Sequence, residues 1–279
     1  MDDSAPPTVT ALLDHPAVQG GAAPLVVALV VAAIFARTRF AWIAMLAAYA
    51  TMIALTTGFA FSPLTAGRKT ILVGLVAPLV GLMLDMLPRA SKTVVTAAAI
   101  AAGAVSIWIF ISILHQREGM AAIATGGGIA LFVTVFVGLT LRLRGDGLRA
   151  GAAGLGLGLA TGIVGLLSAS IGYLLAGVSI AAGAGALLLT QVLLSRKLAA
   201  GFLGTLTFGL LTALFAVGSV LLAELHWYAL PLLLLVPLAV TLRAPERAPL
   251  IVRAAVVVAY ALIAAALPIL VAWFAPRGS

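Results

Sequence analysis

Residues 147–195 decide the fold, and they read GLRAGAAGLGLGLATGIVGLLSASIGYLLAGVSIAAGAGALLLTQVLLS. This stretch carries a single charged side chain, that of Arg149, near its start. A helix rises about 1.5 Å per residue, and the hydrocarbon core of a bilayer is about 30 Å thick. The stretch therefore exceeds twice the bilayer core and has to turn back once. We expect the turn at Ser168–Ser170, where SASIG offers hydroxyls and a glycine.

The composition of the whole chain agrees with this local pattern. Apolar residues make up 63% of the sequence, charged residues only 9%, and the mean hydropathy is +1.24. A soluble domain averages about 25% charged residues, so this chain lacks the polar side chains that would cover a surface in water. We therefore predict an all-α, polytopic integral membrane bundle with lipid as its main solvent.

The apolar runs predict about ten membrane spans joined by short loops, in a single transmembrane domain over residues 1–279. Ten spans also permit a 5+5 inverted repeat, because an odd half inverts its partner. The ninth run contains two prolines and is barely long enough to cross. The expected spans are 17–36, 40–62, 69–88, 93–114, 119–141, 148–168, 171–195, 199–223, 227–242 and 249–274.

Basic residues fall unequally on the two sides of these spans. With the N-terminus outside, twelve lysines and arginines lie in inside connections and four lie outside. This asymmetry is the one that the positive-inside rule expects. Thirteen arginines against three lysines, with much Ala, Gly and Leu, suggest a bacterial source. We therefore predict an inner-membrane protein with both termini periplasmic.

Aromatic residues add a second indication of membrane depth. Trp42, Trp227, Tyr228 and Trp273 lie near the expected span ends, where an interfacial aromatic belt forms. Trp108 lies in the middle of its run, so we expect it to serve in packing.

The first residues, 1–16, form a short exposed segment ahead of the first span. Val9, Leu12 and Leu13 would share one face of a short amphipathic helix that ends at Pro16. Such a helix is typically an interfacial anchor. The alternative is a lid or a contact for a partner.

Asp85 is the one carboxylate inside an otherwise apolar run, LVGLMLDMLPRASK at 79–92. Intramembrane acids are candidates for ion coupling or substrate contact. Asp85, however, lies towards the end of its run and four residues before Arg89, so an interfacial ion pair is the competing interpretation.

Two interruptions of helical pattern could also mark a substrate path. Gly126, Gly127 and Gly128 are consecutive within the fifth run, and each weakens a helix by about 1 kcal/mol relative to alanine. A broken helix there would expose backbone groups to a substrate, as in transporters, while the alternative is a crowded helix crossing. Pro78 would kink the third run by freeing a carbonyl.

A second glycine pattern predicts close helix packing. Gly154, Gly158 and Gly162 recur every four residues and leave one helix face without side chains, which allows close backbone approach. The run at 171–195, with Ala181 and its neighbouring glycines, is the expected partner. A homo-oligomeric interface is the alternative.

The remaining polar residues are few. His115, Arg117, Glu224 and His226 fall in outside turns and could line an outer vestibule, although solvated turns are the usual explanation. Gln191 lies within a run, where it is either a substrate contact or a hydrogen bond between helices.

Several classes of function have no support in the sequence. Cysteine is absent, the three histidines fall in separate segments, and neither a GxxxxGK[ST] motif nor helically paired acids occur. We therefore expect no metal and no cofactor, and we do not favour an enzyme. The scattered basic residues indicate membrane orientation rather than nucleic-acid binding.

Two functions remain. The first is a secondary transporter or permease for a small molecule or ion. The second is a non-catalytic membrane subunit or assembly partner of a larger complex, which would suit the few polar residues and the glycine faces. The lipid bilayer is the one certain partner in either case.

Overall fold

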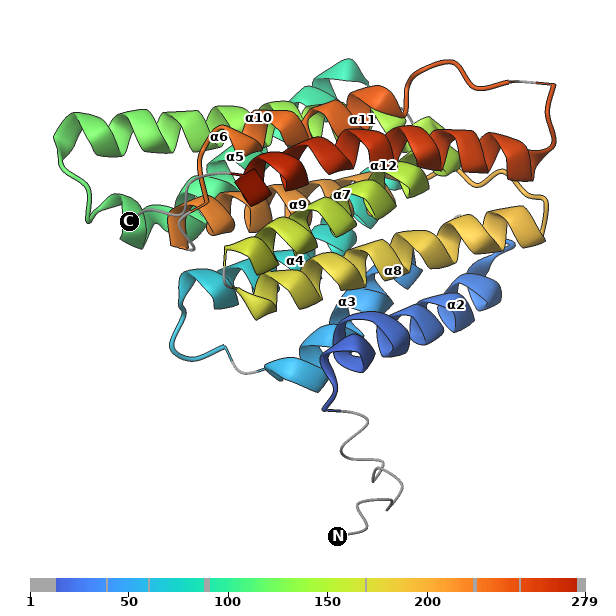
Figure 1. The fold of residues 1–279 in the computed structure, drawn as a ribbon, viewed down its shortest axis with the longest axis horizontal. Coiled ribbons are helices and arrows are strands. Elements are labelled where there is room, and N and C mark those ends of the chain that lie inside the picture. Colours follow the sequence, from blue (N-terminus) through green and yellow to red (C-terminus); the bar gives the residue numbers. More distant parts are fainter. Residues whose placement is uncertain are drawn as a thin grey trace, which may run out of the picture.

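The computed structural model describes residues 14–38, 40–59, 61–87, 91–168, 170–222, 225–245 and 247–274. Within them the chain is helical and forms no strand, which confirms the predicted all-α bundle. The helices run side by side along the long axis of the molecule (Figure 1). They are η1 (Val18–Ala22, a π-helical turn), α2 (Ala23–Phe35), α3 (Ile43–Thr56), α4 (Ala66–Asp85), α5 (Lys92–Leu114), α6 (Gly119–Leu141), η2 (Arg142–Gly145, a 3-10 turn), α7 (Gly147–Leu167), α8 (Ile171–Leu193), α9 (Gly201–Leu222), α10 (Ala229–Leu233), α11 (Leu235–Ala239) and α12 (Leu250–Phe274). The predicted helix of residues 9–13 lies outside the described residues.

Eight helices of the described chain are long and apolar enough to cross a membrane, with η1 and α2 counted as one. The two other predicted spans form shorter apolar helices, α3 and the pair α10 and α11. The break between α10 and α11 follows from Pro237, which has no N–H for the carbonyl of Leu233 and whose ring crowds that carbonyl. The structure is therefore a multi-pass membrane bundle, and the count of ten stays a prediction.

The turn within residues 147–195 lies where the sequence predicts it. α7 ends at Leu167 and α8 begins at Ile171. The hydroxyl of Ser168 donates to the carbonyl of Val164 at 2.7 Å, and the N–H of Ser170 donates to the carbonyl of Gly165 at 2.9 Å. Local hydrogen bonds thus provide donors for carbonyl groups in the last turn of α7. The position of this turn confirms the predicted hairpin.

Glycines line the contact between α7 and α8, which is the most extensive helix contact in the described part of the chain. A Cβ at Gly158 would lie 2.6 Å from the amide nitrogen of Ala181, and one at Gly162 would lie 3.1 Å from the carbonyl of Leu174. Gly177 of α8 completes the contact, since a Cβ there would lie 2.4 Å from the nitrogen of Gly162. Gly154 packs against Ala184 on the same face. This glycine face is therefore used within the chain and is not available to a second copy.

Helix α9 lies at the centre of the bundle. Every residue from Phe202 to Ser219 is buried. Its neighbours are α4, α6, α7 and, with smaller contacts, α3 and α8. Its buried hydroxyls donate to carbonyls of its own preceding turn, as Thr205 does to Gly201 and Thr212 to Phe208. The buried hydroxyls of the central helix thus have their hydrogen-bond acceptors within the helix itself.

The other helices pack around this centre in an asymmetric way. The α2–α3 hairpin packs on α8, α12 packs on α7, and the α5–α6 hairpin contacts α9 mainly through α6. A 5+5 inverted repeat would pair α7 with α3 as α2 pairs with α8. Within the described residues α7 has no contact with α3 of comparable extent, so the packing lacks the symmetry that this repeat requires.

The bundle has one strongly basic end. The last residues of α4, α6 and α8 meet the first residues of α5, α7 and α9 there, as their mutual hydrogen bonds and a shared cavity show. We call this the basic end. The opposite end holds the starts of α4, α6 and α10. The described cations of the connections at the basic end include Arg37, Lys92, Arg142, Arg144, Arg149, Arg196, Lys197, Arg243 and Arg247.

Two tryptophans differ from what the sequence predicts: Trp42, expected in the interfacial belt, and Trp108, expected in the packed interior. Trp42 is 1% exposed because it packs against Gly204 and Phe208 of α9, so its assignment to an interfacial belt is wrong. Trp108 is 43% exposed, and the ammonium of Lys69 lies 5.0 Å from its ring centroid. Its position towards the end of α5 therefore allows a cation–π contact.

Candidate functional site

The carboxylate of Asp85 caps the start of the central helix. Asp85 is the last residue of α4, and its two oxygens accept hydrogen bonds from the N–H groups of Phe202 at 2.8 Å and Leu203 at 2.9 Å. These are first-turn amides of α9, which have no partner inside their own helix. The carboxylate also lies at the positive end of the helix dipole. Asp85 is thus held by backbone 117 residues away in sequence, and Arg89, its expected ion-pair partner, lies outside the described residues.

Gly201 makes room for this cap. Its φ is +65°, in the left-handed region that favours glycine, and a Cβ there would lie 2.4 Å from Oδ2 of Asp85. Other helices use local caps instead, such as Thr65 for α4 and Ser91 for α5. The start of α9 takes its side-chain cap from α4.

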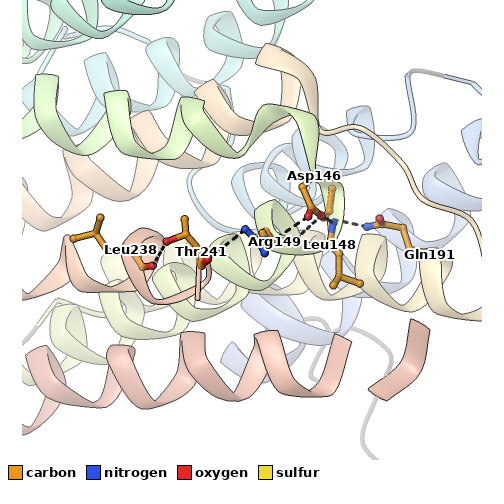
Figure 2. A network of polar contacts seen from close by, with 7 residues as sticks. Asp146, Leu148, Arg149, Gln191, Leu238 and Thr241 are labelled. Atoms are coloured by element: carbon orange, nitrogen blue, oxygen red, sulfur yellow. Dashed lines mark hydrogen bonds and ion pairs between the residues drawn. The ribbon is translucent and has the colours of Figure 1, made fainter. Parts of the chain in front are cut away.

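Gln191 belongs to a second polar cluster at the basic end, shown in Figure 2. Its Nε2 donates to the carbonyl of Gly147 at 3.2 Å (Figure 2). Its Oε1 accepts from the N–H of Leu198 at 3.4 Å. The N–H of Gly147 in turn donates to the carbonyl of Leu198 at 2.9 Å. The side chain therefore joins the start of α7, the end of α8 and the segment before α9. Both of its polar groups have protein partners.

The start of α7 is fixed by the neighbouring acid and base. Asp146 Oδ1 accepts from the N–H groups of Leu148 and Arg149, and its Oδ2 lies 3.4 Å from Nε of Arg149. Nη1 of Arg149 donates to the carbonyl of Thr241 at 3.4 Å, which ties α7 to the segment after α11 (Figure 2). This cluster is a structural connection between helices.

Helix α6 runs without a break through Gly126, Gly127 and Gly128, so of the two interpretations of these glycines the discontinuous helix is wrong. Gly126 packs against Leu114, while a Cβ at Gly127 or Gly128 would meet no atom within 4 Å. The alternative interpretation, a crowded helix crossing, is therefore also wrong at Gly127 and Gly128. Pro78 is buried inside α4, and the helix continues beyond it to Asp85.

A cavity of about 530 Å³ lies between α6, α9 and α10 at the end opposite the basic end. Arg117 and His226 line it together with Thr125 and Gly128. Its apolar walls include Phe132, Ile129, Val217, Val220, Leu221, Leu225, Leu230 and Trp227. Of the predicted site residues, this cavity brings together Arg117, His226 and Gly128. We call it the outer cavity.

Arg117 and His226, the two ionisable side chains of the outer cavity, each contact another side chain. Nη1 of Arg117 donates at 3.3 Å to Oγ1 of Thr125, in the second turn of α6. The His226 ring lies 5.1 Å from the ring of Tyr228. His115 is exposed and does not line this cavity, and Glu224 lies outside the described residues. Sequence reasoning missed Thr125 and the apolar walls, although Thr125 directly precedes the three glycines.

Metal chemistry gains no support from the described part of the chain, where no three His, Cys, Asp or Glu side chains gather in a way that could hold an ion. Comparisons with protein-family models, with curated proteins and with solved structures found no match for this chain.

Proposed function

We propose that the chain is a permease for a small organic anion, with the outer cavity as its vestibule. The observation that carries this proposal is that Arg117 and His226, more than one hundred residues apart in sequence, line one largely apolar cavity. A volume of 530 Å³ falls within the range of about 300–1,000 Å³ that is typical of small-molecule sites.

The lining favours one chemical class of substrate. An arginine guanidinium recognises carboxylates and phosphates through paired N–H donors, and the contact with Thr125 restricts its orientation. The imidazole of His226 adds a second polar group. The rings of Phe132 and Trp227 would accommodate the apolar part of the molecule. A small carboxylate with an apolar body is therefore the best fit.

The proposal includes a topology. We place the basic end in the cytoplasm of a bacterial cell and the outer cavity on the periplasmic side of the inner membrane. The positive-inside rule supports this orientation, because the connections at the basic end carry most of the cations.

Uptake into proteoliposomes tests the function. The purified chain is reconstituted, and entry of radiolabelled mono- and dicarboxylates is measured against empty vesicles. We expect at least one carboxylate to enter, and Arg117→Gln to reduce its uptake about tenfold through the loss of a charge-assisted hydrogen bond.

Arg68→Gln is the matched control. Arg68 lies at the same end, donates to the carbonyl of Pro63 at 3.1 Å and does not line the outer cavity. Its variant should transport as the parent chain does. Uptake of no carboxylate above background, or equal uptake by the Arg117 and Arg68 variants, would refute the proposal.

A membrane subunit is the second candidate, and one surface favours it. Met120, Ile123, Gly127 and Leu131 are exposed along a single face of α6, and Gly127 leaves open space for a close helix approach. Gly127→Leu would then release a copurifying membrane protein, and the purified chain alone would take up no carboxylate. Copurification followed by mass spectrometry separates the two candidates.

A further inference from the structure

A second cavity, of about 860 Å³, lies between α5 and α6 at the basic end. Lys92, Arg142 and Arg144 line it, and no acidic residue does among the described residues. The other lining residues are Val95, Thr96, Ala99, Thr134, Val135, Gly138, Leu139 and Gly145. We call this the basic cavity. Its positive charge favours the binding of an anion.

The basic cavity changes from charged to apolar along its length. Lys92 is the first residue of α5, and Ala99, seven residues further, lies about 10 Å along the helix axis. On α6 the lining runs back from Arg142, just after the helix, to Val135 and Thr134. Cations thus mark the mouth, and small apolar side chains mark the membrane-embedded part.

The cations differ in how they are held. The guanidinium of Arg144 lies 5.3 Å from the ring centroid of Phe202, at the start of α9, so it is fixed against the bundle. Lys92 and Arg142 are exposed at the mouth. Val135 is 41% exposed, which places the apolar wall at the lateral surface of the bundle, where lipid chains lie.

We infer that the basic cavity binds one anionic phospholipid. Its phosphate would lie between Lys92 and Arg142, and an acyl chain would follow Val135 and Leu139 along α6. Charge complementarity carries the inference, because basic hollows between membrane helices attract anionic head groups. The polarity gradient indicates a lipid rather than a free anion, since a free phosphate would leave the apolar wall without a ligand.

Native mass spectrometry tests the inference on the full chain in detergent. Phosphatidylglycerol and phosphatidylcholine, matched in acyl chains, are added in turn, and the bound lipid is counted. We expect selective retention of phosphatidylglycerol. The double variant Lys92→Gln/Arg142→Gln should weaken binding about 25-fold, about fivefold for each cation removed.

Two controls separate the cavity from general surface charge. Arg196→Gln/Lys197→Gln removes the same charge at the same end but outside the basic cavity, and it should retain the lipid. Gly138→Leu keeps every cation and fills the cavity, since a Cβ there meets only the Cβ of Ala99 at 3.7 Å. It should lose the lipid. Val135→Trp serves the same purpose at an exposed position.

Three results would overturn the inference. They are equal loss in the two double variants, full retention in both cavity-filling variants, and displacement of the bound lipid by glycerol phosphate at matched concentration. Glycerol phosphate carries the head-group charge without acyl chains, so its success would mean that only the charge is recognised. Because the measurement counts bound lipid and not uptake, it can fail or succeed independently of the proposed transport.

Discussion

Asp85→Ala, which removes the cap between α4 and α9, should destabilise the bundle, and the size of this effect should depend on whether residue 201 is glycine. Asp85→Ala deletes the acceptor of two first-turn N–H groups, at 2.8 and 2.9 Å. Hydrogen bonds to a charged group contribute about 1.5–3 kcal/mol each, while replacement of an ordinary helix N-cap costs about 0.5–2 kcal/mol. The site is only partly buried, so water replaces part of the loss. We expect about 2–3 kcal/mol of destabilisation.

The same geometry makes Gly201→Ala depend on Asp85. A methyl group on a residue with φ of +65° costs about 1–2 kcal/mol, and here it would also displace the carboxylate. The single variant should therefore lose the cap as well, about 3–5 kcal/mol in all. In the double variant the cap is already gone. Its destabilisation should match that of Gly201→Ala alone, which gives a coupling of about 2–3 kcal/mol, the cost of Asp85→Ala itself.

The assay is reversible unfolding of the purified chain in mixed detergent micelles, followed by circular dichroism. Glu118→Ala is the control, because Glu118 precedes α6 at the N-cap position and makes no cap hydrogen bond with its side chain. It should change stability by less than about 0.5 kcal/mol. Additive effects of Asp85→Ala and Gly201→Ala would refute the capping argument. An unchanged stability with lost carboxylate uptake would instead make Asp85 a coupling group.

Three further predictions follow from single contacts. Tyr49 is 1% exposed, and its hydroxyl has no hydrogen-bond partner among the described residues. Tyr49→Phe should therefore leave the unfolding free energy unchanged or raise it by about 1–2 kcal/mol in the same assay; a loss would reveal a partner. Gly158→Ala should lower it by about 1–3 kcal/mol because backbone of α8 lies within 2.7 Å of the new methyl group, whereas Gly127→Ala, with nothing within 4 Å, should not destabilise. Since the chain has no cysteine, Ser195→Cys and His115→Cys can each be labelled alone in intact cells, and an impermeant maleimide should reach His115→Cys and not Ser195→Cys; the reverse result would invert the proposed topology.

The sequence by itself was sufficient to predict the class of fold and most helix boundaries. Hydrocarbon leaves the backbone no partner but itself, so long apolar runs have to be helices, and a run of twice the bilayer thickness has to turn. The hairpin at Ser168–Ser170 follows from length and turn residues alone. Where prolines interrupt the apolar run, length does not predict that the segment forms two short helices, α10 and α11.

Only the tertiary structure decided what each polar residue does. Asp85 lies four residues from a basic neighbour in sequence, yet its carboxylate caps a helix that begins 116 residues later. Gln191 bonds to backbone of two other segments, and Arg117 shares a cavity with His226 across a similar sequence distance. The physical reason is that hydropathy and periodicity depend on neighbours along the chain. Capping, cavity shape and charge clustering depend instead on which helix ends meet in space.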